Sequence, residues 1–262
     1  MATEIKGGTP LPKQILKMKS FPPYPEATPP LEMVDLPAGL PAPVARYYQV
    51  TCGEQVPVIE SAVITGRGRL RFRGLTFTSR FRFTHNAGRD YRHYIETTLL
   101  GYPIMKVNEY YLDGQGRMEL PFGVIEGEPK IDMAANLGLW GESIWLPSIF
   151  ITHPRVHWET IDDTTAHLVV PFGDQEDIFT VTFDPQTGLL QTMFTMRYRE
   201  ADDEEKIPWH IEAQGWDTFH GLIIPTPMAA TWMDEGKPWA VFTLEDVAYN
   251  VDVSEYIRAS GL

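Results

Sequence analysis

Three ionisable side chains in largely apolar surroundings could carry acid–base chemistry: His93, Glu109 and Glu142. His93 lies in a segment of alternating apolar and polar residues, which predicts a strand. A turn at residues 100–103 would bring Glu109 opposite His93, whereas a slip of one residue would bring Asn108 there instead. A His–Glu pair in an aromatic wall could act as base and acid. The alternative is a structural pair that bridges two strands.

Glu142 lies in the most apolar stretch of the chain, Leu139–Pro147. Burying an unpaired carboxylate there would be costly. The side chain therefore caps a helix, pairs with an arginine, or faces a ligand cavity. If it faces a cavity, we expect it to be the main acid or base, with His93 or Glu109 assisting it.

Metal and thiol chemistry find little support in the sequence. His153 and His157 are four residues apart, but Pro154 follows His153 and the next residues resemble a strand, on which the two side chains would lie roughly 13 Å apart. Cys52 is the sole cysteine, which excludes a disulfide framework and a four-thiolate zinc site. We expect neither a metal nor a cofactor.

The composition excludes several classes of partner. The 262 residues include 22 basic and 35 acidic side chains, a formal net charge of −13. Nucleic acids and anionic membranes require a basic surface, so neither is an expected main partner. No run of 18 apolar residues predicts an integral membrane segment, and a short basic stretch at residues 13–19 does not resemble a secretory signal. The prediction is a cytoplasmic protein, and a homo-oligomer is left open.

Most of the chain has the period of two that is typical of strands, with Gly, Asn and Asp turns between the segments. Short turns favour antiparallel neighbours, and about ten or more strands favour a curled sheet. Residues 129–150 predict a helix or a broken pair of helices that plugs the curve. Residues 1–39 form a proline-rich arm and residues 40–262 a single domain, which begins with a helix. The predicted strands are 58–65, 69–72, 75–84, 90–98, 104–112, 117–120, 155–161, 165–172, 177–184, 189–199, 208–217, 222–232 and 239–250.

The segment 75–84 separates into an aromatic and a basic face. If Asn86-Ala87-Gly88 closes a hairpin, Phe83 lies near Tyr91 and Phe81 near His93. The other face then gathers a glutamate among arginines, which favours a surface ion-pair lattice over an anion site. That group comprises Arg80, Arg82, Arg92, Tyr94 and Glu96.

The order of several short motifs resembles an uncharacterised bacterial domain family, one of the groups of unknown function. Its members look like half-barrel proteins, among them periplasmic lipoprotein carriers, mycobacterial lipid-binding lipoproteins and the violacein-pathway enzyme that rearranges an indole imine dimer. The resemblance implies a strongly curved antiparallel sheet around helices, with an apolar cavity. It covers about residues 40–250 and rests on Leu40–Tyr47, Tyr111–Met118, Glu142–Pro147, Trp158 with Asp162-Asp163, Phe183-Asp184 with Gly188, Arg197–Arg199, Trp209, Gly221 with Ile224-Pro225, and Tyr249-Asn250.

The predicted function is binding of a hydrophobic small molecule or lipid inside the half-barrel, because ligand pockets combine an apolar wall with a few polar groups. The alternative is a cofactor-independent isomerase, cyclase or lyase that acts on such a molecule in the same cavity. A third hypothesis is an interaction protein whose arm docks a partner. The expected ligand-binding residues are Phe77, Phe81, Phe83, Tyr91, Tyr111, Trp140, Trp145, Met193 and Phe194.

Overall fold

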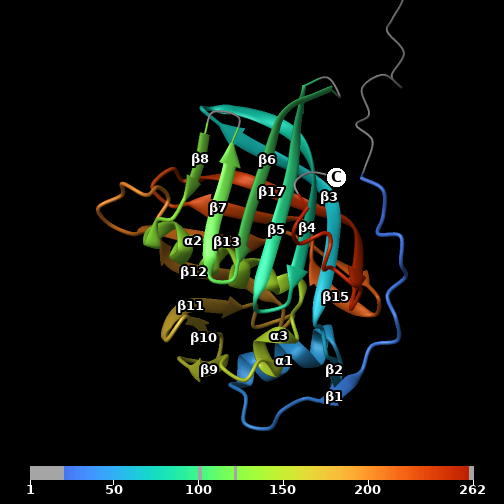
Figure 1. Cartoon of the computed structure of the whole chain (residues 1–262). Helices are drawn as coiled ribbons and strands as arrows, with labels where there is room; N and C mark the ends of the chain where they lie inside the picture. The colour runs from blue at the N-terminus through green and yellow to red at the C-terminus, as the bar shows by residue number, and fades with distance from the viewer. Residues whose placement is uncertain (1–20, 100–101, 121–122, 260–262) are drawn as a thin grey trace, which may run out of the picture.

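A computed structural model describes residues 21–99, 102–120 and 123–259, and it is built around one antiparallel sheet of 13 strands (Figure 1). This confirms the predicted mainly β fold. Across the sheet the strands are β8 (Gly123–Glu126), β7 (Gln115–Leu120), β6 (Tyr102–Leu112), β5 (Asp90–Leu99), β4 (Leu75–Asn86), β3 (Ser61–Phe72), β17 (Lys237–Tyr249), β16 (Met228–Trp232), β13 (Ile207–Ala213), β12 (Leu190–Arg197), β11 (Gln175–Phe183), β10 (Thr165–Phe172) and β9 (His157–Thr160).

Smaller elements lie beside the sheet. Strand β1 (Met33–Asp35) pairs with β2 (Gln55–Pro57), and β14 (Trp216–Phe219) pairs with β15 (Leu222–Pro225). The helices are α1 (Ala42–Thr51), α2 (Pro129–Glu142), the 3-10 turn η2 (Ser143–Trp145) and α3 (Ile149–Thr152). The described residues contain no helix that is long and apolar enough to span a membrane.

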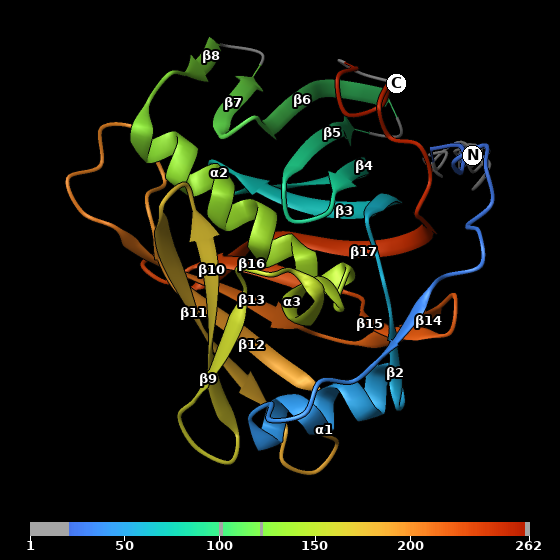
Figure 2. The ribbon, with the colours of Figure 1, turned by 60° about the horizontal axis from the view of Figure 1, so that its bottom comes forward.

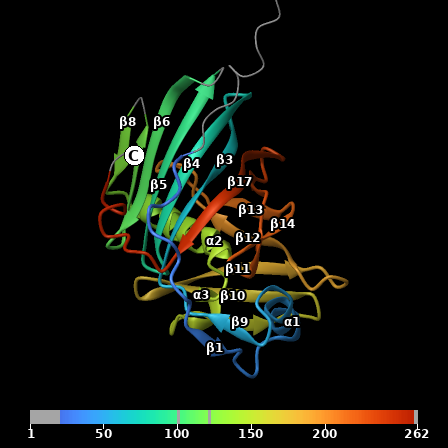
Figure 3. The same cartoon turned by 90° about the vertical axis from the view of Figure 1, so that its right-hand side faces the viewer.

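The sheet curls around helix α2. Pairing register shifts in β5–β6, β11–β12, β16–β17 and β17–β3, and such irregularities bend strands and increase their twist. Figure 3 shows that the strand direction changes from steep in β3–β6 to nearly level in β9–β11. Within the described residues the edge strands β8 and β9 are not paired with each other, so the sheet curls into a half-barrel and does not close.

Helix α2 fills the concave side, with β3–β8 on one side and β9–β13 on the other (Figure 2). From Ala134 to Gly141 every residue of the helix is buried. A helix that is apolar on all sides belongs inside a protein rather than on its surface. The predicted plug over residues 129–150 is therefore confirmed, including its break into shorter helical pieces.

Two turn predictions were wrong. The sequence predicts a turn at Gly66–Gly68 between the strands 58–65 and 69–72, but both glycines lie inside the continuous strand β3. Position 66 requires glycine because a Cβ there would clash with the Thr243 carbonyl oxygen. These glycines permit close approach instead of a turn. The β4–β5 hairpin turns one residue later than predicted, so Phe83 pairs with His93 and not with Tyr91. The displacement is two residues in register, so each side chain keeps its predicted face.

Strand boundaries near the C-terminal end also differ from the prediction. The segment 208–217 is interrupted after β13, and the segment 222–232 divides into β15 and β16 at Thr226-Pro227. Proline lacks the N–H that a ladder needs, so Pro227 separates the two strands.

The outer face of β4 and β5 is covered by the two ends of the described chain. The Phe21 ring of the N-terminal arm lies over the Arg80 guanidinium, with the Arg80 Cζ 4.3 Å from the ring centre. The Tyr256 ring lies in the same way over Arg82, with 4.5 Å between the Arg82 Cζ and the ring centre. Glu96, which pairs with Arg80, is 3% exposed. The predicted surface ion-pair lattice is therefore wrong, because the arm and the C-terminal segment bury it. Residues 1–20 of the predicted arm lie outside the described residues.

Candidate functional site

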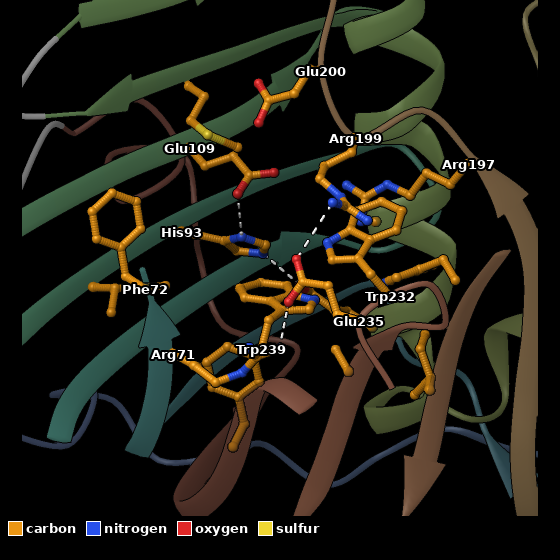
Figure 4. Close-up of a pocket in the computed structure, with 18 of the residues that line it drawn as sticks. Arg71, Phe72, His93, Glu109, Arg197, Arg199, Glu200, Trp232, Glu235 and Trp239 are labelled. Carbon is orange, nitrogen blue, oxygen red and sulfur yellow. Dashed lines mark hydrogen bonds and ion pairs between the residues drawn. The ribbon is translucent and has the colours of Figure 1, made fainter. Parts of the chain in front are cut away.

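A cavity of about 590 Å³ lies between the inner face of the sheet and helix α2 (Figure 4). One wall comes from β4–β6 and includes Phe83, His93 and Glu109. The opposite wall comes from β12, β13, β16 and β17 and carries Arg197, Trp209, Ile211, Met228, Ala230, Trp232, Trp239 and Phe242. Helix α2 closes one side with Ile131, Gly138 and Glu142.

The mouth lies among the tips of three hairpins. Arg71–Gly74 form the end of β3 and the turn into β4, Tyr198–Glu200 follow β12, and Glu235 belongs to the β16–β17 turn. Arg199 and Arg71 both pair with Glu235, which joins these tips through ion pairs (Figure 4). The exposed charges mark the entrance, whereas the cavity behind them is mostly apolar.

Space remains in the cavity partly because small residues face it. Gly138 lies on α2 and Ala230 on β16, where larger side chains would project inward. A Cβ at Gly138 would meet the Tyr91 hydroxyl at 3.4 Å and an Arg197 nitrogen at 3.6 Å, which are ordinary contacts. These two small residues therefore contribute to the open space.

A row of ionisable groups, which are 5–19% exposed, lines part of the cavity. His93 pairs with Glu109 across β5 and β6, as the sequence predicts, with Nδ1 and Oε2 3.7 Å apart. The other ring nitrogen, Nε2, lies 2.5 Å from Glu142 Oε2 at the end of α2. The Tyr91 hydroxyl donates a hydrogen bond of 2.7 Å to Glu109. All three predicted acid–base residues therefore meet, His93 and Glu109 from the sheet and Glu142 from the end of α2.

Aromatic rings hold the His93 imidazole in place. The Tyr91 ring, also in β5, stacks on the imidazole with ring centres 4.2 Å apart. The Phe83 ring, from the neighbouring strand β4, lies with its centre 4.0 Å from the imidazole centre. His93 is 4% exposed. The ring is fixed by packing and by two carboxylates, so it presents a defined geometry to the cavity.

The electrostatics of this row favour a protonated His93 between two carboxylates. Burial alone lowers the pKa of His93, but Glu142 and Glu109 outweigh burial and raise the pKa to about 9. Burial alone raises the pKa of Glu142, but His93 and His85 together outweigh burial and lower that pKa to about 2. The pKa of Glu109 is also lowered, since His93 outweighs the effect of burial there.

The sequence analysis missed His85, which lies behind this row. His85 is fully buried, and its Nε2 lies 3.4 Å from Glu142 Oε2. Neither ring nitrogen forms a hydrogen bond with any described residue. Burial is the largest influence and lowers the pKa of His85, so the ring is neutral. The alternation of β4 would have placed it on the face of Phe83, had the predicted strand not ended at residue 84.

The cavity wall also contains aromatic and basic residues that were not predicted. The Arg197 guanidinium lies 4.4 Å from the Trp209 ring centre and 5.6 Å from that of Trp232. Its Nε is buried without a hydrogen-bond partner among the described residues. The alternation of Trp209 with Ile211 was the available signal, but it does not say that the shared face borders empty space.

Of the nine predicted ligand-binding residues, Phe83 lines the cavity. Five others are buried in the packing around it: Phe81, Tyr91, Trp140, Trp145 and Met193. Phe77 is half-buried and is not part of the wall, and Phe194 is 36% exposed. Tyr111 borders a separate hollow of about 460 Å³ at the start of α2. Most of the predicted aromatic residues therefore pack behind the cavity wall and do not line it.

The protein is similar to several proteins of known structure. A LolA superfamily protein from Nitrosomonas europaea shares 9% identity over 84% of this chain and 99% of that chain, with a TM-score of 0.48. A DUF1329 family protein from Desulfovibrio piger shares 13% identity over 81% of this chain and 92% of that chain, with a TM-score of 0.44. The search of curated proteins found no match. The model of the DUF6544 family, a family of unknown function, matches residues 31–244. The chain therefore belongs to the DUF6544 family, which confirms the uncharacterised family that its motifs resemble.

Proposed function

We propose that this protein binds a hydrophobic small molecule or lipid in the cavity beside α2. The observation that carries the proposal is a cavity of about 590 Å³ whose wall is mostly apolar and includes the ionisable row of His93, Glu109 and Glu142. Ligand pockets typically measure about 300–1,000 Å³ and combine these two properties. The tryptophan side chains of β13, β16 and β17 would contact the apolar body of the ligand.

The polar groups define how such a ligand would be oriented. His93, Glu109 and Glu142 line the cavity as one group, and Arg197 lies across from His93 (Figure 4). A ligand with one polar group would place it toward this row, because leaving the group in the apolar part would forfeit its hydrogen bonds. The remainder would extend toward the mouth.

A binding experiment with a blocked cavity tests the proposal. The full chain, stripped of bound lipid, is titrated with the fluorescent apolar probe 1-anilinonaphthalene-8-sulfonate, and the Ala230→Trp variant is titrated in parallel. We expect one probe per chain and at least a tenfold loss of affinity in the variant, because its indole would occupy the cavity. The Phe194→Ala variant is the matched control, since this exposed aromatic is not part of the wall.

A cooperative thermal transition in both variants establishes that they are folded. Probe binding by Ala230→Trp with the affinity of the unmodified protein would contradict the proposal. Native mass spectrometry of freshly purified protein, with identification of any co-purifying apolar molecule, then gives the chemical class of the ligand.

An enzyme that acts on the bound molecule is the second candidate. The observation that favours it is the convergence of His93, Glu109 and Glu142 on the cavity wall, within contact of a bound ligand. A positioned acid or base contributes about 10²–10⁴-fold to a rate. Glu142→Gln should then abolish turnover of the molecule found by mass spectrometry, and unchanged turnover would exclude this role.

A further inference from the structure

His85 forms no hydrogen bond that would account for an imidazole at its position in β4. The ring is fully buried, yet neither nitrogen forms a hydrogen bond with any residue that the structure describes. A buried polar group without a partner loses its hydration and gains nothing in return. A phenylalanine or leucine would fill this position without that cost, so an unpartnered histidine here calls for a ligand.

Two further donor atoms converge on the same point. Glu142 Oε2 lies 3.4 Å from His85 Nε2 and 2.5 Å from His93 Nε2. All three donor atoms lie within 4.8 Å of one another. Two imidazoles and one carboxylate are a common donor set for divalent transition metals, including Zn²⁺ and Fe²⁺.

We propose that His85, His93 and Glu142 bind one divalent transition-metal ion, with a coordination position that opens into the cavity. His93 and Glu142 line the cavity, whereas His85 lies behind them in β4. Three protein ligands with a fourth position left to water or substrate distinguish catalytic zinc sites from structural ones. A bound ligand would therefore reach the metal from the cavity side.

The surroundings of His93 also fit a metal ligand. With Nε2 directed at the site, its Nδ1 faces Glu109, whose other oxygen accepts the Tyr91 hydroxyl. Histidine ligands usually donate their second N–H to a carboxylate, which fixes the ring and increases its basicity. Glu109 and Tyr91 would thus act as positioning residues and not as ligands.

One local adjustment accompanies binding. Donor atoms about 2.1 Å from a tetrahedral metal lie about 3.4 Å from each other. His85 and Glu142 already have this spacing, and His93 and Glu142 would separate from their direct hydrogen bond. The metal would take the place of the proton between them. The metal-bound state and an acid–base pair at His93 and Glu142 are therefore mutually exclusive.

Calorimetric titration with Zn²⁺ alone tests the site. The full chain is dialysed against EDTA, then against chelator-free buffer, and compared with His85→Phe and His93→Gln. We expect one strong zinc site per chain, and at least a tenfold loss of affinity in each variant. His85→Phe also removes the 3.4 Å contact with Glu142, so a cooperative thermal transition of the metal-free variant is used only to show that it is folded. If the His85 ring served only in packing, His85→Phe would bind zinc with the affinity of the unmodified protein.

The surface provides a matched control. His157, which is exposed, and His167, which is half-buried, flank Glu159 at 3.8 and 3.7 Å, so the double variant His157→Asn, His167→Asn removes two imidazoles elsewhere. It should keep the strong site, and Glu109→Gln should weaken that site about tenfold or more. Absence of strong zinc binding, equal binding by His85→Phe, or loss of the site in the surface variant would overturn the proposal. If His85→Phe does not fold, His93→Gln and Glu109→Gln decide the outcome. The zinc result is independent of probe binding in the cavity.

Discussion

The strongest energetic prediction concerns the pH dependence of stability that arises from His93. The two carboxylates beside it raise its pKa from the ordinary value of 6.5 to about 9 in the folded protein. Each pKa unit of difference between the folded and unfolded states corresponds to about 1.4 kcal/mol. The protonated ring therefore adds about 3 kcal/mol to the free energy of unfolding, a large part of the typical total of about 5–15 kcal/mol.

The sign of this effect follows from proton binding. Between pH 6.5 and 9 the folded protein keeps a proton that the unfolded chain releases, so stability falls as the pH rises. The contribution is complete below pH 6.5 and is lost as the pH passes about 9. Below pH 6.5 the buried neutral His85 acts in the opposite direction, because its pKa is lowered. The buried tyrosines have raised pKa values and act above about pH 10, outside this window.

Urea unfolding at several pH values between 6.5 and 9, in the presence of EDTA, measures the effect. We expect the unmodified protein to lose about 3 kcal/mol over this range. Glu142→Gln should cost about 3 kcal/mol at pH 6.5, because it leaves one partner of a buried ion pair alone. It should also flatten the pH dependence, since only Glu109 then holds the proton.

Glu159→Gln is the matched control for this experiment. Glu159 also lies beside two histidines, but on an exposed surface, where ion pairs contribute little. Its pH dependence should equal that of the unmodified protein. Constant stability of the unmodified protein between pH 6.5 and 9, or an unchanged slope in Glu142→Gln, would refute the assignment of the raised pKa to this pair.

Four further substitutions test the packing through the free energy of unfolding in urea. Gly138→Ala should stabilise α2 by up to about 1 kcal/mol, because the added Cβ would make only ordinary contacts. Gly141→Ala should destabilise the protein, because the added Cβ would lie 2.6 Å from Ile211. The reverse order would contradict the packing of α2. Phe21→Ala should cost about 3 kcal/mol if the arm is part of the folded domain, and no change would mean that the arm does not hold the outer face. Asn250→Ala should cost about 2–3 kcal/mol. The Asn250 side chain accepts hydrogen bonds from two backbone N–H groups and donates one to a backbone carbonyl, and its own φ of +53° disfavours alanine. An unchanged free energy of unfolding would show that the turn does not need these bonds.

Alternation and turn residues were sufficient to predict much of the fold. The aromatic face of β4 and the pairing of His93 with Glu109 followed from a period of two and the position of a turn. The mid-chain helix and its break followed from apolar residues, glycines and a proline. Local rules of this kind act over a few residues, so they remain valid wherever the segment lies in the fold. They failed at Gly66, where a distant strand requires the glycine.

Only the tertiary structure decided which side chains meet. Glu142 and His85 come from α2 and β4, and their distance from His93 depends on how the sheet curls around the helix. The cavity likewise depends on the difference between the volume that the sheet encloses and the volume of all the side chains inside it. A sequence determines which face a residue occupies, because that is set by its immediate neighbours along the strand. It does not show whether the space in front of that face is filled, because this depends on residues more than a hundred positions away.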